Sequence, residues 1–261
     1  MRIALALEYS GHAFCGFQSQ PEACGVQDAL SRALSKIADR SVRVFAAGRT
    51  DAGVHAASQI VHFDTDAARP ETAWVRGVNA HLPPTAAVLW ACPVADEFHA
   101  RFSSLARHYS YLLLTRRQRP GLFAPYVGWY HSTLDVDAMR EGAQCLLGTH
   151  DFSSFRAAEC QAKSPIKTLA VVTIEQQGAL VRFEFSANAY LHHMIRNIVG
   201  ALVSVGTGVH TAASLAEILA ARDRTRAPAT FAASGLYFAG VDYEPRFALP
   251  LTVRRVGYPF A

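Results

Sequence analysis

The sequence predicts an α+β protein built from two successive halves, each with the element order β-α-β-β-α-β. Residues 2–9 alternate apolar and polar side chains, which is the period of a half-buried strand. The apolar residues of 26–38 instead recur with the spacing of a helix that buries one face. The same order of elements begins again after about residue 105, so we expect one half at 1–104 and the other at 105–261.

The first half begins with the strand and the helix named above, and the helix keeps a polar face from Gln27 to Lys36. Pro70 is expected to open a second helix, because a proline at the first helical position loses no hydrogen bond. Pro83 and Pro84 close that helix. The remaining predicted elements of this half are a short strand at 42–46, a strand at 58–63, the helix itself at 71–80, and a strand at 88–94.

The second half repeats this order with a hairpin in the middle. Asp135 is the expected N-cap of its first helix, and the turn at 176–179 joins the two strands of the hairpin. The predicted elements are a strand at 107–114, a helix at 136–147, hairpin strands at 167–175 and 180–186, helices at 190–205 and 214–221, and a strand at 235–242. Each half therefore matches the ferredoxin-like arrangement, a four-stranded antiparallel sheet with helices on one face, which RNA-recognition modules share.

Composition indicates an ordinary soluble enzyme. Hydrophobic residues make up 51% of the 261 residues, which is enough for one large domain or two small ones. The start of the chain alternates and meets Glu8 too early for a signal peptide, and no apolar run approaches the roughly 18 to 20 residues of a membrane span. The five cysteines are scattered without any Cys-x-x-Cys pair, so neither a disulfide framework nor a zinc site is predicted, which fits a reducing cytoplasm. The 11 histidines show no metal-ligand spacing, so no metal is predicted either.

Positive charge is concentrated in the second half. Residues 1–104 carry 9 basic and 10 acidic side chains, whereas residues 105–261 carry 16 basic and 11 acidic ones. Two groups of arginines could neutralise a phosphate backbone, or could equally be solvated loop residues. These groups are Arg116, Arg117 and Arg119, and Arg222, Arg224 and Arg226.

One loop carries a carboxylate between two glycines. In Gly48-Arg49-Thr50-Asp51-Ala52-Gly53, the glycines permit backbone conformations closed to other residues and a close approach by another molecule. Arg49 can keep Asp51 ionised or bind a phosphate. A tight turn is the alternative interpretation of this pattern. A P-loop is excluded because no Lys-Ser/Thr pair follows the glycines, and an aspartic protease would need a second Asp-x-Gly triplet.

The full string Gly48-Arg49-Thr50-Asp51-Ala52-Gly53-Val54-His55-Ala56 resembles the signature loop of the TruA family of tRNA pseudouridine synthases. The resemblance covers nearly the whole chain. Further matching stretches are Gly16-Phe17-Gln18-Ser19-Gln20, with Phe17 in place of the usual tryptophan; Gly77–Pro83; Phe98–Phe102; Ala106–Tyr111, with His108 where Arg or Lys is common; His150–Phe155; and His192–Gly200.

The resemblance implies a role for five residues. Asp51 would be the catalytic residue, Tyr109 the active-site tyrosine that stacks on the target base, and Arg196 the arginine that pairs with Asp51. Arg49 would fill the gap left by the extruded base or meet a phosphate, and Gln18 would contact substrate. Taken singly, Tyr109 could instead be a core aromatic residue and Arg196 a surface side chain that extends to solvent.

The resemblance also implies the activity, which is conversion of uridine to pseudouridine in the anticodon arm of tRNA, at positions 38, 39 and 40. The reaction changes no atom count and needs no cofactor. The family further implies a homodimer acting on tRNA rather than on DNA or at a membrane, and one extended sheet with a central cleft. Two alternatives stay open: a tandem RNA-binding module that has lost catalysis, and a hydrolase with an aspartate nucleophile.

Overall fold

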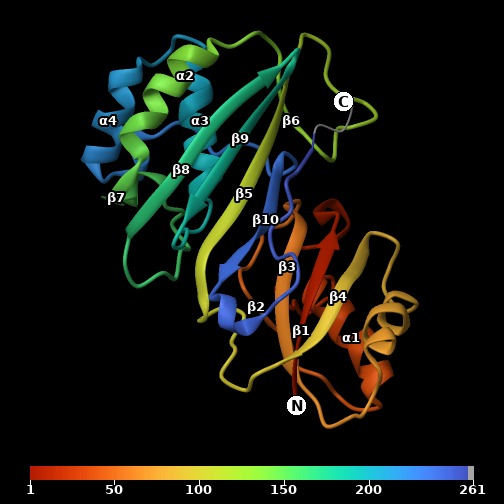
Figure 1. Cartoon of the computed structure of the whole chain (residues 1–261). Coiled ribbons are helices and arrows are strands. Elements are labelled where there is room, and N and C mark those ends of the chain that lie inside the picture. The colour runs from red at the N-terminus through yellow and green to blue at the C-terminus, as the bar shows by residue number, and fades with distance from the viewer. Residues whose placement is uncertain (258–261) are drawn as a thin grey trace. The chain divides into compact units, whose positions relative to one another are not determined.

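The computed structural model describes residues 1–257, and among them it contains ten strands and four α-helices (Figure 1). The strands are β1 (Arg2–Tyr9), β2 (Phe45–Ala46), β3 (His55–Asp64), β4 (Ala86–Val94), β5 (Ser104–Thr115), β6 (Gly128–Tyr130), β7 (Gly148–Asp151), β8 (Ile166–Gln177), β9 (Leu180–Ala187) and β10 (Leu236–Tyr243). The helices are α1 (Val26–Ala38), α2 (Val136–Ala143), α3 (Met194–Gly206) and α4 (Ala212–Ala221). The predicted α+β class with mainly antiparallel strands is confirmed.

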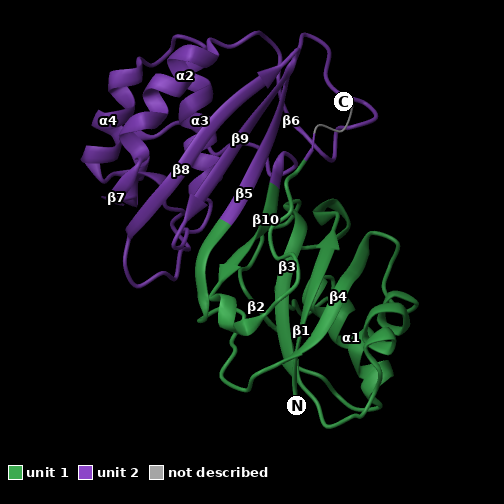
Figure 2. Cartoon of the chain, in the orientation of Figure 1, with its two compact units in different colours: residues 1–107, 237–256 green, residues 108–236, 257–261 purple. Residues whose placement is uncertain are grey.

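The chain folds into two compact units, which Figure 2 distinguishes by colour. Unit 1 contains residues 1–107 and 237–256, and residues 108–236 make up most of unit 2. The predicted halves, 1–104 and 105–261, differ from this grouping in the place of the last segment. The last segment belongs to unit 1 because β10 pairs parallel with β3, with Tyr237 opposite His55. The Trp90 side chain also donates a hydrogen bond to the Leu251 carbonyl.

Unit 1 has β1 at the centre of its sheet, antiparallel to β3 on one side and to β4 on the other. The short strand β2 and the C-terminal strand β10 share the outer edge of β3, β2 opposite Val61 and His62 and β10 opposite His55 and Ala56. The order β4-β1-β3-β2 is that of a ferredoxin-like half. Helix α1 spans the predicted residues and buries Leu30 and Leu34 completely, as its apolar stripe requires.

Unit 2 contains the predicted hairpin, in which β8 and β9 pair antiparallel from Leu169–Ala187 to Gln177–Leu180. Strand β7 pairs antiparallel with β8, and β6 pairs parallel with β5. Asp135 is the N-cap of α2, since its carboxylate accepts from the Ala138 N–H at 2.9 Å. β5 is a single strand that runs from unit 1 into unit 2.

The structure differs from the sequence prediction at several element ends. The helix expected at 71–80 is mainly a π-helical stretch at Ala73–Gly77, and the helix expected at 136–147 ends at Ala143 before a 3₁₀ turn. The helix expected from residue 190 begins at Met194, because His193 has φ of +60° and cannot belong to a right-handed helix. Strands β6 and β7 were not predicted, since three or four residues are too few to show an alternation.

The cysteine prediction is wrong at one pair. Cys15 and Cys24 form a disulfide, with their Cα atoms 5.5 Å apart, in the connection between β1 and α1. The Cys15 N–H also donates to the Cys24 carbonyl at 3.1 Å, so the backbone itself brings the two sulfurs together. Spacing in the sequence could not reveal this pairing. Within residues 1–257, no helix is both long and apolar enough to cross a membrane.

Candidate active site

The loop of residues 47–54, between β2 and β3, carries Asp51 and is held by a buried glutamine. The Gln59 side chain is completely buried on β3. Its Nε2 donates to the Gly48 carbonyl at 2.8 Å, and its Oε1 accepts from the Gly48 N–H at 3.4 Å. Both ends of one amide therefore bind the same glycine, which fixes the start of the loop.

Thr50, the neighbour of Asp51, is held from two sides. Its hydroxyl is 2.8 Å from the hydroxyl of Tyr9, and its carbonyl accepts from the Phe17 N–H at 2.9 Å. Burial raises the pKa of Tyr9 to about 12, so the phenol stays protonated at physiological pH and can serve as a hydrogen-bond donor in this network. Tyr9 and Phe17 are themselves buried, and the loop therefore rests on the core of unit 1.

Two glycines, Gly53 within the loop and Gly16 packed against it, adopt backbone conformations that favour glycine. Gly53 has φ of +80°, and the turn it makes brings the Val54 N–H to the Asp51 carbonyl at 3.1 Å. Gly16 has φ of +94°, and a Cβ at this position would lie 3.0 Å from the Thr50 carbonyl oxygen. The segment around Gly16 thus packs directly on the backbone beside Asp51, which explains the glycine in both matching stretches.

Replacing Gly16 with alanine is expected to lower the free energy of unfolding by about 1–2 kcal/mol and to reduce turnover as well. The added Cβ both strains the backbone and pushes on Thr50, so the Asp51 loop must move. Gly178→Ala is the matched control, because Gly178 also has positive φ (+58°) but its Cβ would have no atom within 4 Å. Urea unfolding and turnover of both variants check this: equal losses of turnover would contradict the packing argument.

Arg107 also holds the start of the loop. Its Nε and Nη2 donate to the Ala47 carbonyl at 3.1 and 3.0 Å, and Nη2 also donates to the Arg101 carbonyl at 3.0 Å. Arg107 lies on β5 within unit 1, two residues before Tyr109. An arginine that gives its N–H groups to backbone carbonyls has a positioning role, so the part of β5 in unit 1 is tied to the loop that carries Asp51.

The three candidates in unit 1 lie within this framework. Asp51 is half-buried, at the middle of the fixed loop, whereas Arg49 and Gln18 are exposed. Gln18 is next to Phe17, and the Phe17 N–H donates to the Thr50 carbonyl of the loop. Exposed polar and cationic groups beside a half-buried carboxylate suit a site that receives a large polar substrate.

Tyr109 and Arg196 both lie in unit 2. Tyr109 is 9% exposed on β5, and its ring meets the ring of Tyr190 edge to face with centroids 5.0 Å apart. Arg196 is half-buried in the first turn of α3, and its Nε donates to the Phe231 carbonyl at 2.9 Å. The Phe231 N–H in turn donates to the Arg196 carbonyl at 3.1 Å.

The segment that Arg196 binds has a second anchor. The Tyr111 hydroxyl donates to the Ala232 carbonyl at 2.8 Å, next to Phe231. Burial raises the pKa of Tyr111 well above its usual range, so this phenol stays a donor. Arg196 is therefore a fixed side chain rather than one that extends freely to solvent. Of the five candidate site residues, Gln18, Arg49 and Asp51 lie in unit 1, and Tyr109 and Arg196 lie in unit 2.

Three positioning residues, Tyr9, Gln59 and Arg107, were missed in the sequence analysis. Gln59 had a usable signal, because it is a polar residue directly before the apolar pair Ile60 and Val61 of β3 and must find partners if that strand is buried. Tyr9 had none, since a tyrosine at the end of an alternating strand reads as an ordinary core residue.

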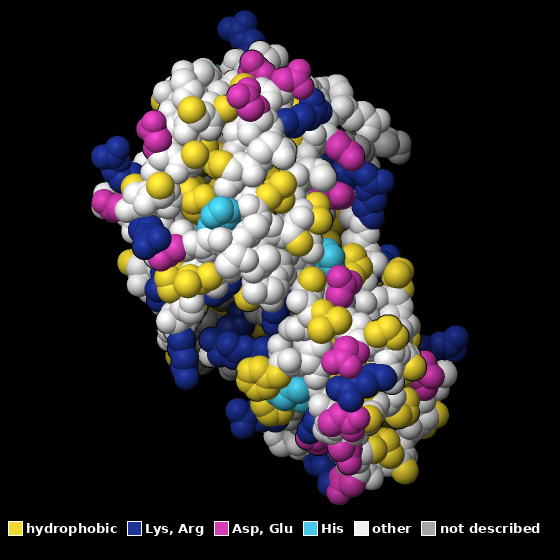
Figure 3. Space-filling model, turned by 60° about the vertical axis from the view of Figure 1, so that its left-hand side comes forward, with side chains coloured by type: hydrophobic (Ala, Val, Ile, Leu, Met, Phe, Trp, Pro, Cys, Tyr) yellow, Lys and Arg dark blue, Asp and Glu magenta, His cyan; other side chains and the backbone are white. Residues whose placement is uncertain are grey.

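The arginines of unit 2 are not equivalent. Arg224 is half-buried and donates to the Ala227 carbonyl at 2.9 Å and to Oδ1 of Asn197 at 3.1 Å, which is a structural role. The other members of the two arginine groups, Arg116, Arg117, Arg119, Arg222 and Arg226, are exposed. Figure 3 shows Lys and Arg side chains spread over the face that it presents, next to hydrophobic side chains and histidines.

Known proteins match the chain over most of its length. A family model described as tRNA pseudouridine synthase matches residues 5–103 and 143–244. The chain is 62% identical to the tRNA pseudouridine synthase A of Chromobacterium violaceum over 251 residues, 96% of either chain. It is 57% identical to that of Thiobacillus denitrificans over 261 residues, 100% of either chain, and 56% identical to that of Aromatoleum aromaticum over 250 residues, 96% of this chain and 95% of the relative.

Among solved structures, a chain of the Cbf5-Nop10-Gar1 complex aligns with 90% of this chain and 48% of its own length, at 11% identity and a TM-score of 0.38, which is too distant to support an argument. The family model and the full-length relatives are decisive without it. The chain belongs to the family of tRNA pseudouridine synthases that its Asp51 loop resembles.

Proposed function

We propose that this protein is an isomerase that converts uridine to pseudouridine in tRNA, with Asp51 as its catalytic carboxylate. The observation that carries the proposal is the loop itself: the signature string is complete from Gly48 to Ala56, and Gln59 and Thr50 hold it by buried hydrogen bonds. A carboxylate on a loop fixed in this way is preorganised, as a reacting group needs to be.

The reaction detaches uracil from the ribose, turns it, and rejoins it through C5. Asp51 can attack the sugar carbon as a nucleophile or remove a proton from the ribose as a base, and both are within the chemistry of a carboxylate. Tyr109 would stack on the extruded base and can relay the proton that leaves C5 in the last step. Arg196 would keep Asp51 charged and oriented, and Arg49 and Gln18 would contact the RNA around the target uridine.

The preferred target is the anticodon arm, at positions 38, 39 and 40, and the acting species is a homodimer in the cytoplasm. These finer assignments rest on the family resemblance. Three transcripts of one tRNA test the target, each with a single uridine among the three positions, followed by carbodiimide modification and primer extension to map pseudouridine. Modification at all three sites supports the assignment; modification confined to another arm would contradict it. Sedimentation at catalytic concentration tests the dimer.

Replacing Arg196 with methionine is expected to lower kcat on the order of 10²-fold, because the reaction loses the cation that orients the carboxylate. Methionine keeps the apolar stem of the side chain but also gives up the bond to the Phe231 carbonyl. Tyr111→Phe is the matched control, since it removes the neighbouring bond to the Ala232 carbonyl and leaves the cation in place. If both variants lose turnover equally, Arg196 acts only by holding that segment.

An RNA-binding module without catalysis is not favoured. The full-length relatives are named synthases, and Asp51, Tyr109 and Arg196 are all present in this chain. The hydrolase alternative likewise has no support among the comparisons.

A further inference from the structure

A group of aromatic rings lies at the surface of unit 1, with an arginine at each end. The His99 ring lies between Phe45, at 5.7 Å between centroids, and Phe102, at 4.4 Å. The guanidinium carbon of Arg43 is 4.9 Å from the Phe45 ring, and that of Arg101 is 5.6 Å from the Phe102 ring. We call these five residues the aromatic platform.

Phe102 is 76% exposed, which is unusual for a phenylalanine. It is nevertheless held in place. Nδ1 of His99 accepts from the N–H groups of Arg101 and Phe102, at 3.1 and 3.3 Å, and Oγ of Ser103 accepts from the His99 N–H at 3.0 Å. Three hydrogen bonds within residues 99–103 fix the turn that carries Phe102. The exposed ring therefore projects from an ordered turn.

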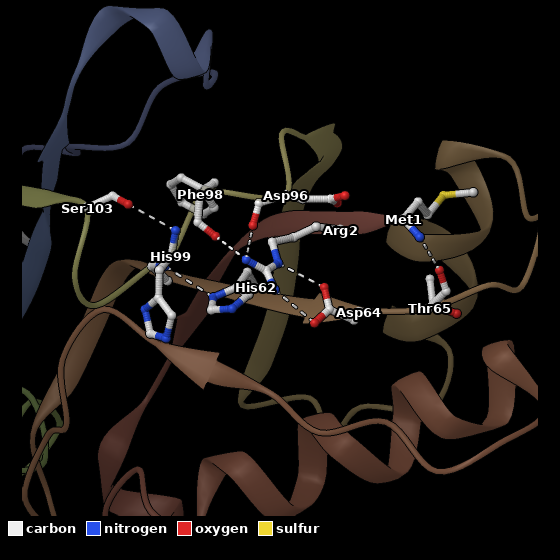
Figure 4. Close-up of polar contacts among 10 residues, drawn as sticks. Met1, Arg2, His62, Asp64, Thr65, Asp96, Phe98, His99 and Ser103 are labelled. Atoms are coloured by element: carbon white, nitrogen blue, oxygen red, sulfur yellow. Dashed lines mark hydrogen bonds and ion pairs between the residues drawn. The ribbon is translucent and has the colours of Figure 1, made fainter.

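The base of the platform is equally fixed, as Figure 4 shows. Arg2 donates to the carbonyls of Asp96 and Phe98, the latter at 2.8 Å, and pairs with the Asp64 carboxylate, also at 2.8 Å. His62, stacked on Phe45 with centroids 5.0 Å apart, accepts from the Ala100 N–H at 3.1 Å. The whole 96–103 segment is therefore anchored on β1 and β3.

His62 and His99 are both neutral at physiological pH. Burial lowers the pKa of His62 to about 4, and it also lowers the pKa of His99. Because Nδ1 of each ring accepts a hydrogen bond from a backbone N–H, the ring proton lies on Nε2. The positive charge of the platform thus comes from its two arginines, and the rings between them offer uncharged π faces.

The chemistry of the platform selects its ligand. A flat, exposed ring with cations on both sides suits a planar base joined to phosphates, since base stacking is indifferent to sequence and the arginines can neutralise the backbone. The platform also adjoins the Asp51 loop, because Phe45 lies in β2, immediately before that loop, and Arg107 binds the carbonyls of both Ala47 and Arg101. A nucleotide bound here would be held by the same framework that fixes Asp51.

We propose that the aromatic platform binds an unpaired nucleotide of the tRNA other than the target uridine, with the base stacked on Phe102 and the adjoining phosphates near Arg43 and Arg101. The proposal rests on the proposed function in that it takes tRNA as the ligand. It adds a second point of attachment, which would help to set the position of the target uridine relative to Asp51.

The test compares three substitutions at one exposed position. Phe102→Ala is expected to weaken binding of a full-length tRNA transcript by about 5- to 150-fold, which is the value of one stacked base, and to raise KM in the same proportion with little change in kcat. Phe102→Trp keeps a stacking face and is expected to bind at least as well as the parent. Phe102→Leu keeps apolar surface without a π face and is expected to behave as the alanine variant. The matched control is Leu122→Ala, because Leu122 is 81% exposed in unit 2 and should not affect binding.

Two results would overturn the proposal. One is unchanged affinity in Phe102→Ala. The other is full affinity in Phe102→Leu together with an altered oligomeric state in Phe102→Ala by sedimentation, which would make the platform a protein interface. Phe102→Trp gives a direct signal, since its added indole fluorescence should be quenched by tRNA. Failure of the proposed function would look different, because the parent protein itself would then produce no pseudouridine.

Discussion

Asp51→Asn is expected to lower kcat by about 10³-fold or more while the fold and the affinity for tRNA stay close to those of the parent. Asparagine has the shape of aspartate but neither its charge nor its basicity, and the reaction depends on these. The loop around residue 51 is held through Gly48, Thr50 and Val54, whose hydrogen bonds to Gln59, Phe17 and the Asp51 main chain do not involve the carboxylate.

The controls for this variant are circular dichroism, urea unfolding and tRNA binding. A loss of turnover with native values for all three places Asp51 in the chemistry. Loss of turnover together with unfolding would mean that Asp51 stabilises the fold instead. Turnover at the parent rate would show that another residue performs the reaction.

Tyr109→Phe and Tyr109→Ala are expected to separate two roles of one side chain. Phenylalanine keeps the ring and its edge-to-face contact with Tyr190, so tRNA binding should survive, while the step that removes the C5 proton should slow. Alanine removes the ring as well and should also weaken binding, by roughly 1–3 kcal/mol for one stacked base. Single-turnover rates and binding constants of the two variants measure this.

The rates of the two variants distinguish a stacking role of Tyr109 from a proton-relay role. If the phenylalanine variant keeps the full rate and only the alanine variant loses it, Tyr109 is a stacking surface and the proton leaves by another route. Tyr190→Phe serves as the control, because it keeps the ring packing and alters only the neighbouring hydroxyl.

The parts of the fold that the sequence predicted well are those with a strong period. The apolar stripe of α1 follows from burial of one face, and α1 and β1 begin and end where expected. The strand expected at 58–63 is the longer β3, His55–Asp64. The expectation of a half-buried strand at 2–9 was wrong, because the side chains from Ile3 to Leu7 are all buried. The helix ends were less accurate. The left-handed backbone of His193 makes α3 begin at Met194 rather than at the predicted residue 190. The presence of a histidine does not predict that conformation.

The candidate site shows the same division. The Asp51 loop could be found from its glycines and its resemblance to a family, because both are local in sequence. Tyr9 and Arg107 could not, because they act through partners 41 and 60 residues away along the chain. Gln59 signals only that a buried polar side chain needs a partner, and its partner is 11 residues away. The Cys15–Cys24 disulfide was missed for a related reason, since only the path of the backbone between β1 and α1 shows that the two sulfurs meet.

The most direct test of the central claim is release of tritium from tRNA labelled at C5 of uridine. Joining the base to the ribose through C5 must displace that hydrogen, and no hydrolase or binding module would do so. We expect the protein to release one tritium for each pseudouridine formed, without added metal or cofactor, and Asp51→Asn to release none above background. Pure protein that binds the labelled tRNA and releases no tritium, or an Asp51→Asn variant that releases it at the parent rate, would contradict the account.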